Sequence, residues 1–445
     1  MRVIVIGGDA AGMSAASQIK RLRPEHEVVV FERGGYISYA ACGIPYFVGG
    51  AVGSMDDLLE LSLDDAREKR KIDVRTGHTV TAIDPAARTV IVEHGGASRV
   101  EPWDCLVIAT GARPRTQGID IHGLRNVFTM NDLTDAQRIM DFMTRRRPRN
   151  VAVIGGGYIG LEAAEQFSGL GIGTTLVHRR EDLHRSFEKE ISDIIKDRLS
   201  RNGVGLNLGK PLVGMEKRGE KVGVVLDSDV IEFDAVLLTL GVEPNSDLAE
   251  DAGISLGVSR AVRVDEFMQT DAEGIYAAGD CATARMSVFG IEVHAPLALK
   301  ANKQGLIAGM NIAGVREAFA GVLNTAITKV FDLGVARTGL SFDQARKLGL
   351  EPEKVTVTSR DRARYYPGSS PLDSLVIVGQ KDRRVLGAQL AGRPEAVKRI
   401  DVYVTAIFCG MTVDKVFDLD LAYAPPFSPV YDPVLLAARV ARKAK

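Results

Sequence analysis

The hydrophobic pattern at the start of the chain predicts a strand, a glycine-rich turn, a helix and a second strand in close succession. An apolar run over residues 2–6 ends in the turn Gly7–Gly12, and residues 13–22 have helical composition. A β-rich run over residues 27–31 follows and ends in Glu32. This order is typical of a dinucleotide-binding βαβ unit, in which the turn and the helix N-terminus meet a pyrophosphate and the acidic residue binds a ribose.

The same pattern returns in the middle of the chain. An apolar run over residues 151–154 ends in the turn 155–160, and a helical segment and a second strand continue the pattern to residue 177. This turn has all three glycines of the fingerprint, whereas Asp9 occupies the middle glycine position of the first turn. The Asp9 carboxylate must therefore face away from a phosphate or meet a positive partner. Two such units predict two nucleotide cofactors.

The second unit ends differently from the first. The chain reads His178-Arg179-Arg180 at the place where an acidic residue would bind the ribose of NADH. An acid would repel a 2′-phosphate, whereas two guanidiniums can bind it through paired hydrogen bonds. The alternative is a solvated basic turn. The pattern favours NADPH, and NADH stays open.

Shorter patterns fill the region between the two units. Residues 56–72 are charge-rich and predict a helix. The runs 80–83, 89–92 and 106–109 are separated by turn residues and predict a small antiparallel section.

The rest of the chain predicts two further features. The apolar run 236–240 ends in a glycine turn like the one after residues 107–109, and we expect the chain to cross between domains at both turns. A helix is predicted after Pro296. From about residue 321 the pattern changes to strands with a helix near residues 394–409, which predicts an α+β domain.

Length and charge narrow the class of protein. A chain of 445 residues exceeds what one hydrophobic core usually supports, so several domains are expected. The formal net charge of −1 gives no electrostatic case for binding nucleic acid or a membrane surface. The N-terminal apolar run is too short for a signal peptide, and no later run approaches the length of a membrane span. We therefore expect a cytoplasmic protein.

Four cysteines are spread widely along the chain. Their spacing matches no zinc-binding pattern and no disulfide framework, and no nearby pair could store two electrons as a dithiol. Cys105 and Cys409 lie in apolar segments and are expected in the core.

Cys42 lies in the stretch Ser38–Gly50, which is interrupted by glycine and proline. An isolated cysteine in an apolar stretch is more often a small buried hydrophobe than a nucleophile. Pro45, however, fits the first turn of a helix that would begin just after the thiol. A helix start at this place would favour the thiolate form of Cys42.

Five motifs together carry a resemblance to a known family. They are Gly7–Gly12 with Glu32, Ser38-x-x-x-Cys42-Gly-x-Pro45, Gly155–Gly160, Ala278-Gly-Asp280 and Tyr423-Ala-Pro-Pro-Phe427. Across essentially its whole length the chain resembles the flavoprotein disulfide reductases of the single-cysteine class, which are related to NADH oxidases and NADH peroxidases. Within that class it is most similar to the coenzyme A-disulfide reductases.

The resemblance implies a fold, two cofactors and a homodimer. The fold class is α/β, with two Rossmann-like dinucleotide-binding domains as in glutathione reductase and a C-terminal α+β dimerisation domain. FAD is expected on residues 1–112 and 243–320, NADPH or NADH on residues 113–242, and the dimer contact on residues 321–445. Coenzyme A is expected as substrate and as partner in a mixed disulfide.

The resemblance also implies site residues. The redox thiol is Cys42, and Tyr365 and Tyr423 of the partner subunit face it, with Tyr366 an equal candidate for Tyr365. Tyr158 is expected to cover the flavin until nicotinamide arrives. The positions expected to hold the nucleotide end of coenzyme A are Gln18, Arg21 and Ser38. The positions expected to contact the two cofactors are Gly7, Asp9, Ala10, Ala11, Gly12, Glu32, Arg33, Val80, Thr110, Gly111, Asp280, Ala298, Gly155, Gly157, Tyr158, Ile159, Gly160, His178, Arg179, Arg180 and Gly241.

Two departures from the family's pattern bear on the reaction. Ala41 stands where some relatives carry Asn beside the cysteine, which removes one substrate contact. Ala10 stands where peroxide- and oxygen-reducing relatives carry His. Cys42, without a neighbouring thiol, has two oxidised forms open to it, a mixed disulfide with a small thiol and a sulfenic acid. Because Ala10 supplies no proton, the pattern favours the mixed disulfide.

The implied cycle carries electrons from NAD(P)H through FAD to a mixed disulfide of Cys42 and coenzyme A. Tyr423 or Tyr365 supplies the proton for the leaving thiolate. Three alternatives stay open. They are an NAD(P)H oxidase or peroxidase that reduces O₂ or H₂O₂ through a sulfenic acid, a reductase of polysulfide through coenzyme A persulfide, and a redox-sensing module that holds FAD and turns over slowly.

Overall fold

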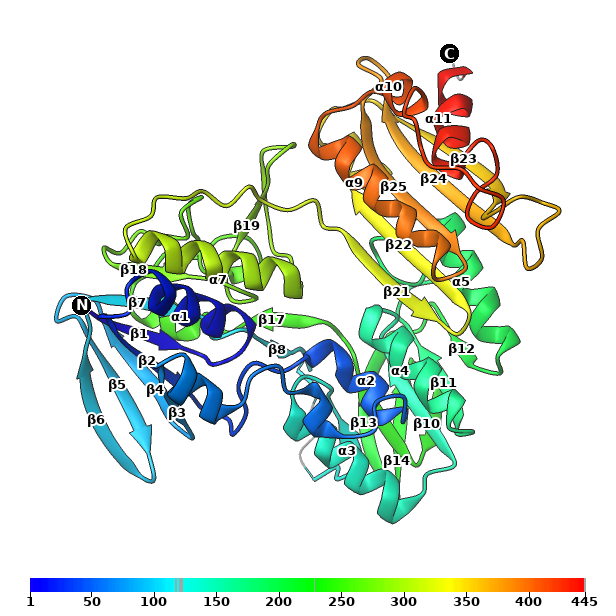
Figure 1. Ribbon diagram of the computed structural model, residues 1–445. Coiled ribbons are helices and arrows are strands. Elements are labelled where there is room, and N and C mark those ends of the chain that lie inside the picture. Colours follow the sequence, from blue (N-terminus) through cyan, green and yellow to red (C-terminus); the bar gives the residue numbers. More distant parts are fainter. Residues whose placement is uncertain (117, 120–122, 228, 444–445) are drawn as a thin grey trace. The chain divides into compact units, whose positions relative to one another are not determined.

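The computed structural model describes residues 1–116, 118–119, 123–227 and 229–443 (Figure 1). The chain forms two compact units, which are described separately. Unit 1 comprises Met1–Arg115, Met130–Arg138 and Gly241–Val322. Unit 2 comprises Thr116–Thr129, Ile139–Leu240 and Leu323–Lys445.

Unit 1 is built on a five-stranded sheet. Its strands lie in the order β18 (Ile275–Ala277), β7 (Cys105–Ile108), β1 (Arg2–Ile6), β2 (Glu27–Glu32) and β3 (Asp73–Thr76). All four pairings are parallel. The central strands β7, β1 and β2 have apolar, buried interiors because both faces of the sheet are covered there, whereas the edge strand β3 has only one buried residue. The first predicted βαβ unit is therefore confirmed as β1, α1 (Ala10–Leu22) and β2.

Two helices of unit 1 pack against each other at very short range. The helix predicted after Pro296 is α7 (Ala298–Ile312), and it lies beside α1 (Figure 1). A Cβ atom added to Gly305 would lie 2.1 Å from the Ala11 carbonyl oxygen, and one added to Gly309 would lie 2.7 Å from that of Ala15. Glycine at these positions lets the α7 backbone reach the first turn of α1.

Two predictions for the region between the units need correction. The runs 80–83 and 89–92 do lie in an antiparallel sheet, formed by β4 (Thr79–Asp84), β5 (Thr89–His94) and β6 (Ala97–Pro102). The third run, however, is β7, which pairs in parallel with β1 in the main sheet. This run is apolar at every position, which is typical of a strand buried on both faces.

The helix predicted over residues 56–72 is also wrong. The segment forms two separate short helical pieces instead of one helix, the 3₁₀ helix η2 (Met55–Leu58) and the π-helix η3 (Asp65–Lys69). Between them the backbone pairs with the segment that leads to Cys42, because the Ala40 N–H donates to the Leu58 carbonyl at 2.7 Å and the Glu60 N–H to the Ser38 carbonyl at 2.8 Å. These long-range bonds replace the local helical ones.

Short elements complete unit 1. Strand β8 (Ala112–Pro114) pairs antiparallel with β17 (Val242–Pro244), so the two stretches after the glycine turns lie side by side. The others are α2 (Ile44–Val48), α6 (Asp247–Asp251), η4 (Val258–Arg260), β19 (Ala284–Met286) and β20 (Ile291–Val293).

Unit 2 contains the second βαβ unit in a parallel sheet. Its strand order is β12 (Gly205–Asn207), β11 (Gly173–Val177), β10 (Asn150–Ile154), β16 (Ala235–Leu238) and β9 (Val127–Phe128). Helix α4 (Tyr158–Gly169) follows β10, which confirms the prediction. The other elements of this part are the C-terminal part of α3 (Leu133–Arg146), whose residues up to Arg138 belong to unit 1, α5 (Lys189–Arg201) and the antiparallel strands β13 (Leu212–Arg218), β14 (Lys221–Leu226) and β15 (Asp229–Phe233).

The C-terminal part of unit 2 has the predicted α+β composition. An antiparallel sheet has the order β21 (Ala326–Val330), β22 (Leu333–Gly339), β25 (Val385–Gly392), β24 (Pro371–Gly379) and β23 (Pro352–Arg360). Helix α9 contacts β22 and β25, and α11 contacts β23 and β24 (Figure 1). The helical elements are α8 (Phe342–Lys347), η5 (Ala396–Arg399), α9 (Ile400–Phe408), α10 (Val413–Phe417) and α11 (Pro433–Lys443).

Two findings complete the description. Cys409 is exposed just beyond the end of α9, so its predicted core position is wrong. Across the described residues, no helix combines the length and the apolar character that crossing a bilayer requires.

Candidate functional site

Cys42 lies in unit 1 on a short helical turn, η1 (Ala41–Gly43), that leads directly into α2. Pro45 stands in the first turn of α2, as predicted. The thiol is exposed and forms no disulfide. Cys42 is therefore not the small buried hydrophobe that an isolated cysteine most often is, and its sulfur is open to reagents.

The segment that carries Cys42 is fixed to the first glycine turn. Ser38 adopts a left-handed backbone with φ of 43°, and its N–H donates to the Gly8 carbonyl at 2.9 Å. The next N–H, of Tyr39, donates to Asp9 Oδ1 at 3.1 Å. A Cβ atom on Gly43 would lie 2.3 Å from Leu58 Cδ2, so the residue beside the thiol has no room for a side chain. These contacts attach the segment that carries Cys42 to the first glycine turn.

The first glycine turn itself is closed by backbone contacts. Gly7 has φ of +105°, and an added Cβ atom would lie 2.2 Å from the Ala109 carbonyl oxygen. A Cβ atom on Gly12 would lie 1.9 Å from the Gly7 carbonyl oxygen. Ala10 and Ala11 are the first residues of α1. Only glycine allows the strand, the turn and the helix to approach this closely.

Asp9 occupies the middle position of this turn, directly before α1. A backbone N–H, that of Tyr39, meets its carboxylate, rather than a cationic side chain. Burial raises the pKa of Asp9 to about 6, and the charges of Glu32 and Asp280 act in the same direction. The Asp9 carboxylate is thus buried, held by a backbone N–H, and close to two other carboxylates.

Glu32 stands at the carboxyl end of β2, where a ribose would bind. Its Oε2 accepts from the Gly8 N–H at 2.8 Å and its Oε1 from the Gly34 N–H at 2.6 Å. Two backbone donors therefore fix the carboxylate, while each oxygen keeps a second lone pair for a hydroxyl group.

Asp280 supplies the observation that tests whether a dinucleotide fits unit 1. Its Oδ1 is buried and has no hydrogen-bond partner among the described residues, and burial raises the pKa of the carboxyl group. A buried acceptor of this kind requires a donor. The hydroxyl groups of a bound FAD are suitable donors, so the residues present fit this cofactor.

The loop that presents Asp280 is held by buried polar side chains of α7. Lys300 Nζ donates to the carbonyls of Gly279 at 2.8 Å and Ala282 at 3.0 Å. Gln304 Oε1 accepts from the Gly279 N–H at 3.1 Å. The backbone on either side of Asp280 is therefore fixed by the fold before any ligand binds.

The other residues predicted to contact FAD lie on the same unit. Thr110 Oγ1 donates to the Asn245 carbonyl at 2.6 Å, and Gly111 follows with φ of +67°. Val80 lies in β4, Ala298 begins α7, and Arg33 is exposed just after β2. Gly241, which lies within the range 113–242 predicted for NAD(P)H, also belongs to unit 1, where it has φ of +91° and immediately precedes β17.

The second glycine turn, in unit 2, has the same closure. Gly155 has φ of +122°, and an added Cβ atom would lie 2.2 Å from the Thr239 carbonyl oxygen. A Cβ atom on Gly160 would lie 1.9 Å from the Gly155 carbonyl oxygen. Gly157 differs, because nothing lies within 4 Å of an added Cβ atom. This open space at the start of α4 suits a pyrophosphate.

His178 locks this turn. Its Nδ1 accepts from the Gly156 N–H at 3.1 Å, so that nitrogen carries no proton, and its Nε2 is buried without a hydrogen-bond partner. Burial and the neighbouring Arg179 and Arg180 lower the pKa of His178. The two arginine side chains are exposed. The arrangement leaves the guanidiniums, rather than the imidazole, available to an anionic ligand.

Tyr158 and Ile159 are the first two residues of α4. The Tyr158 ring lies 3.9 Å from that of His184 and 6.1 Å from that of Phe187, measured between centroids. Burial raises the pKa of Tyr158 to about 12 and lowers that of His184 to about 4. Both rings are therefore neutral near pH 7.

The residues predicted for coenzyme A lie at two places in unit 1. Gln18 is buried on α1, and its Oε1 accepts from Arg21 Nη1 at 2.9 Å. Ser38 lies on the segment that leads to Cys42. Gln18 and Arg21 form one polar pair on a face of α1. Ser38 is separated from them in sequence and lies on a loop with a left-handed backbone.

The two tyrosines predicted to act in catalysis are brought together in unit 2. Tyr365 is 76% exposed, and its hydroxyl hydrogen-bonds to that of Tyr423, which raises the pKa of Tyr365. Tyr366 is 37% exposed. The pairing with Tyr423 distinguishes Tyr365 from its neighbour, which the sequence pattern could not do.

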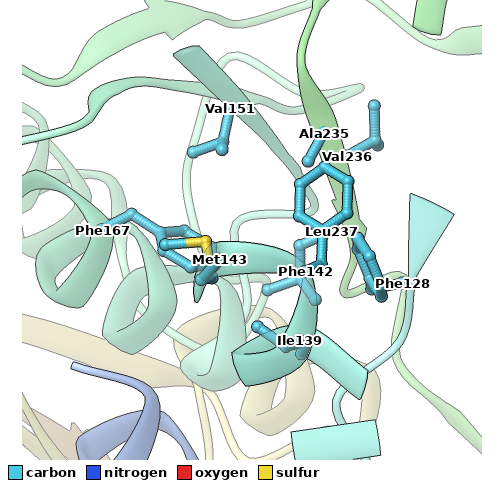
Figure 2. Close-up of a pocket in the computed structure, with 9 residues that line it drawn as sticks. All are labelled: Phe128, Ile139, Phe142, Met143, Val151, Phe167, Ala235, Val236 and Leu237. Atoms are coloured by element: carbon cyan, nitrogen blue, oxygen red, sulfur yellow. The ribbon is translucent and has the colours of Figure 1, made fainter. Parts of the chain in front are cut away.

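An enclosed cavity in unit 2 plays no part in this site. It measures about 10 Å³ and lies between α3, α4 and the parallel sheet, as Figure 2 shows. Its lining is entirely apolar and consists of Phe128, Ile139, Phe142, Met143, Val151, Phe167, Ala235, Val236 and Leu237. A space of this size without polar partners holds neither a cofactor nor an ordered water.

Comparison with known proteins assigns the family. Residues 1–305 match the pyridine nucleotide-disulphide oxidoreductase family, and residues 325–433 match the dimerisation domain of that family. The chain is 40% identical over 440 residues to the NAD(P)H coenzyme A polysulfide/persulfide reductase of Pyrococcus horikoshii, covering 99% of this chain and 98% of that protein.

Two further relatives carry different activities in their names. The coenzyme A disulfide reductase of Staphylococcus haemolyticus is 30% identical over 445 residues, covering 99% of each chain. The solved structure of a water-forming NADH oxidase from Lactobacillus brevis matches with a TM-score of 0.95 at 28% identity, covering 100% of this chain and 98% of that one.

Proposed function

The chain belongs to the pyridine nucleotide-disulphide oxidoreductase family, and we propose that it uses NAD(P)H to reduce coenzyme A disulfide through Cys42. As a member of this family it is an oxidoreductase and a flavoprotein. The observation that carries the proposal is the exposed Cys42 thiol on a segment hydrogen-bonded to the first glycine turn. No other cysteine occurs among the first 104 residues, so this thiol has no sequence neighbour with which to form a disulfide.

Each nucleotide has a set of residues suited to it. FAD would be held by the turn Gly7–Gly12, Glu32 and Asp280, and when bound it would supply the transfer of two electrons from a pyridine nucleotide to a disulfide. The pyridine nucleotide would be held by the turn 155–160. Exposed Arg179 and Arg180 favour NADPH over NADH, because guanidiniums bind a 2′-phosphate.

Cys42 acts as the nucleophile. Its thiolate attacks one sulfur of coenzyme A disulfide, so that a Cys42–coenzyme A disulfide bond forms and the original sulfur–sulfur bond breaks. The released coenzyme A thiolate takes a proton from Tyr423 or Tyr365. The Gln18–Arg21 pair and Ser38 bind the nucleotide end of the substrate.

A homodimer completes the site in this proposal. The match of residues 325–433 to a dimerisation domain supports it, as does the exposure of Tyr365 and Tyr423. The tyrosine pair of each subunit would serve the Cys42 of the other. The domain limits proposed for this assembly are 1–112 with 243–320 for FAD, 113–242 for NAD(P)H and 321–445 for dimerisation, and the expected location is the cytoplasm.

The test is Cys42→Ser. The variant should lose reduction of coenzyme A disulfide while keeping the visible absorbance of bound FAD, because the serine hydroxyl cannot form the mixed disulfide. Cys409→Ser, which changes another exposed cysteine, is the matched control and should keep full activity. Disulfide reduction at the wild-type rate by Cys42→Ser refutes the proposal.

Two other acceptors deserve assay beside coenzyme A disulfide. The Pyrococcus relative is named for polysulfide and persulfide, which can be attacked by the same thiolate. The Lactobacillus oxidase structure supports oxygen as the alternative, with Cys42 passing through a sulfenic acid. Ala10 offers no proton to that route, so we expect steady-state NADPH oxidation to be faster with the coenzyme A acceptors than with oxygen or peroxide.

A further inference from the structure

We propose that Arg399 is a positioning residue that clamps together the two segments bearing the tyrosine pair, residues 361–370 and 423–432. The inference rests on the proposed role of Tyr365 and Tyr423 in the reaction. It adds a residue far from both tyrosines in sequence whose guanidinium binds both segments at once.

The Arg399 guanidinium reaches three anchor points from the end of η5. Its Nη2 donates to the Asp361 carbonyl at 3.0 Å, at the start of the first segment, and to the Phe427 carbonyl at 2.5 Å, within the second. Its Nε donates to Asp432 Oδ2 at 2.8 Å, where the second segment meets α11. The planar fork of arginine suits several acceptors held at fixed angles.

The first segment is closed at its neck by Asp361, which is buried. Oδ1 of Asp361 accepts from the Ser370 N–H at 2.9 Å, and the Asp361 N–H donates to the Ser370 carbonyl at 3.0 Å. Oδ2 forms ion pairs with Arg393 at 3.2 Å and Arg362 at 3.4 Å. The ends of the loop are therefore fixed, while Tyr365 stands exposed between them.

The second segment is anchored in the same way at its far end. Asp432 accepts from Ser428 Oγ at 3.0 Å and from the Val434 N–H at 2.9 Å. One direct backbone bond joins the two segments, from the Ala363 N–H to the Pro425 carbonyl at 3.1 Å. Arg399 thus joins two segments that touch each other and that are each anchored separately.

An exposed hydrogen bond explains why the clamp is needed. In the single subunit the Tyr365 and Tyr423 side chains are 76% and 47% exposed, and a hydrogen bond between hydroxyls that water reaches contributes little net stability, because water competes for both groups. The pair persists only if the two backbones are held in place. Removing the guanidinium leaves the carbonyls of Asp361 and Phe427 and the carboxylate of Asp432 without that donor.

The experiment compares Arg399→Gln and Arg399→Lys with Lys398→Gln. Lys398 is the neighbouring residue and is exposed. Among the ion pairs of the described residues it pairs only with Asp401, three positions further on. Lys398→Gln therefore removes one positive charge, as Arg399→Gln does, without removing a contact to either segment. In the full-length holoenzyme, Arg399→Gln should lower kcat for coenzyme A disulfide roughly tenfold or more, because misplaced groups cost rate steeply. The KM for NADPH should stay unchanged, and Lys398→Gln should match the wild type.

A second readout does not depend on turnover. In the wild type the hydrogen bond to Tyr423 raises the pKa of Tyr365. An ultraviolet titration of tyrosinate should therefore contain one phenol with a raised pKa, and this phenol is assigned to Tyr365 by its loss in Tyr365→Phe. In Arg399→Gln that phenol should titrate near the ordinary tyrosine value. Arg399→Lys keeps the charge and the aliphatic part of the side chain but lacks the planar guanidinium, so it should show the same change to a smaller extent. It replaces the glutamine variant in the test if that variant does not fold.

The outcomes separate the clamp from the proposed function. Wild-type kcat and wild-type phenol titration in both Arg399 variants would overturn the clamp. If Tyr365→Phe and Tyr423→Phe keep full disulfide reduction, the proton role of the tyrosines fails, but the titration still decides whether Arg399 positions them.

Discussion

The two dinucleotide-binding turns close identically but face their ligands differently. Gly7 and Gly155 would each place a Cβ atom 2.2 Å from a carbonyl oxygen of the neighbouring strand end. Gly12 and Gly160 would each place one 1.9 Å from the carbonyl oxygen of the first glycine of the turn. The positions that join strand to helix therefore admit only glycine in both units, whatever the ligand.

The positions that face the ligand have diverged. Asp9 stands where the second unit has Gly157, and Glu32 stands where it has His178 followed by two exposed arginines. The first turn is surrounded by carboxylates that hydrogen-bond to backbone amides, whereas the second presents guanidiniums to solvent. We interpret the first as a site that holds its dinucleotide through fixed hydroxyl acceptors and the second as a site that attracts an exchanging anion by charge.

The closure predicts the largest effect. Gly155→Ala forces a methyl group into a backbone carbonyl at a φ that side chains rarely adopt, and overpacking of this kind costs about 1–3 kcal/mol. The purified variant should keep the visible absorbance of FAD but fail to bleach when NADPH is added. Gly169→Ala, at the C-terminal end of α4 and away from the turn, is the matched control, since its methyl group meets no described atom within 4 Å. A Gly155→Ala enzyme that bleaches normally would show that closure is not essential.

The charge difference predicts the next effect. Replacing Arg179 and Arg180 by Gln removes charge-assisted contacts that, because both side chains are exposed, together contribute about 1.5 kcal/mol, so Kd for NADPH should rise about tenfold. Binding of NADH, which lacks the 2′-phosphate, should change little. Isothermal titration of both nucleotides checks this, and equal weakening of the two would mean that the arginines act only as a solvated turn.

A substitution at Glu32 should have no larger effect, and it should weaken the binding of FAD instead of NADPH. Glu32→Gln keeps the shape but weakens acceptance of hydroxyl hydrogen bonds, so retention of FAD during dialysis should fall roughly tenfold while NADPH affinity stays constant. Fluorescence of released flavin measures the loss. An unchanged FAD content would place the ribose elsewhere.

Asp9 predicts the smallest effect, and it depends on pH. Its pKa is raised from 3.8 to about 6 in the folded protein, so folding favours the protonated form, and stability falls as pH rises from about 4 to about 6. Asp9→Asn should therefore stabilise the FAD-free protein by about 1–2 kcal/mol at neutral pH and by little at about pH 4. Urea unfolding at the two pH values checks the sign, and a variant that is less stable at neutral pH contradicts it.

The sequence was sufficient for features that depend on local pattern. Apolar runs predicted the buried parallel strands β1 and β10, and the glycine turns after them predicted the helices α1 and α4 that follow. The charged segment over residues 56–72 failed because its helical pattern competes with backbone pairing to Ser38–Ala40, which is a contact between distant residues.

Residues that are joined only by tertiary contacts could not be predicted from the sequence. His184 and Phe187 surround Tyr158, and Arg399 binds the tyrosine segments, yet neither set has a spacing that marks it. The choice between Tyr365 and Tyr366 likewise needed the hydrogen bond to Tyr423, because neighbouring residues on a loop share one pattern.

The most direct test of the account is the intact mass of the protein after treatment with coenzyme A disulfide, measured under denaturing, non-reducing conditions. The account predicts a mass increase of one coenzyme A thiol on the wild type, which is lost on adding reductant and absent from Cys42→Ser. A wild-type protein that stays unmodified, or that gains only oxygen, would contradict the claim that Cys42 forms a mixed disulfide with coenzyme A.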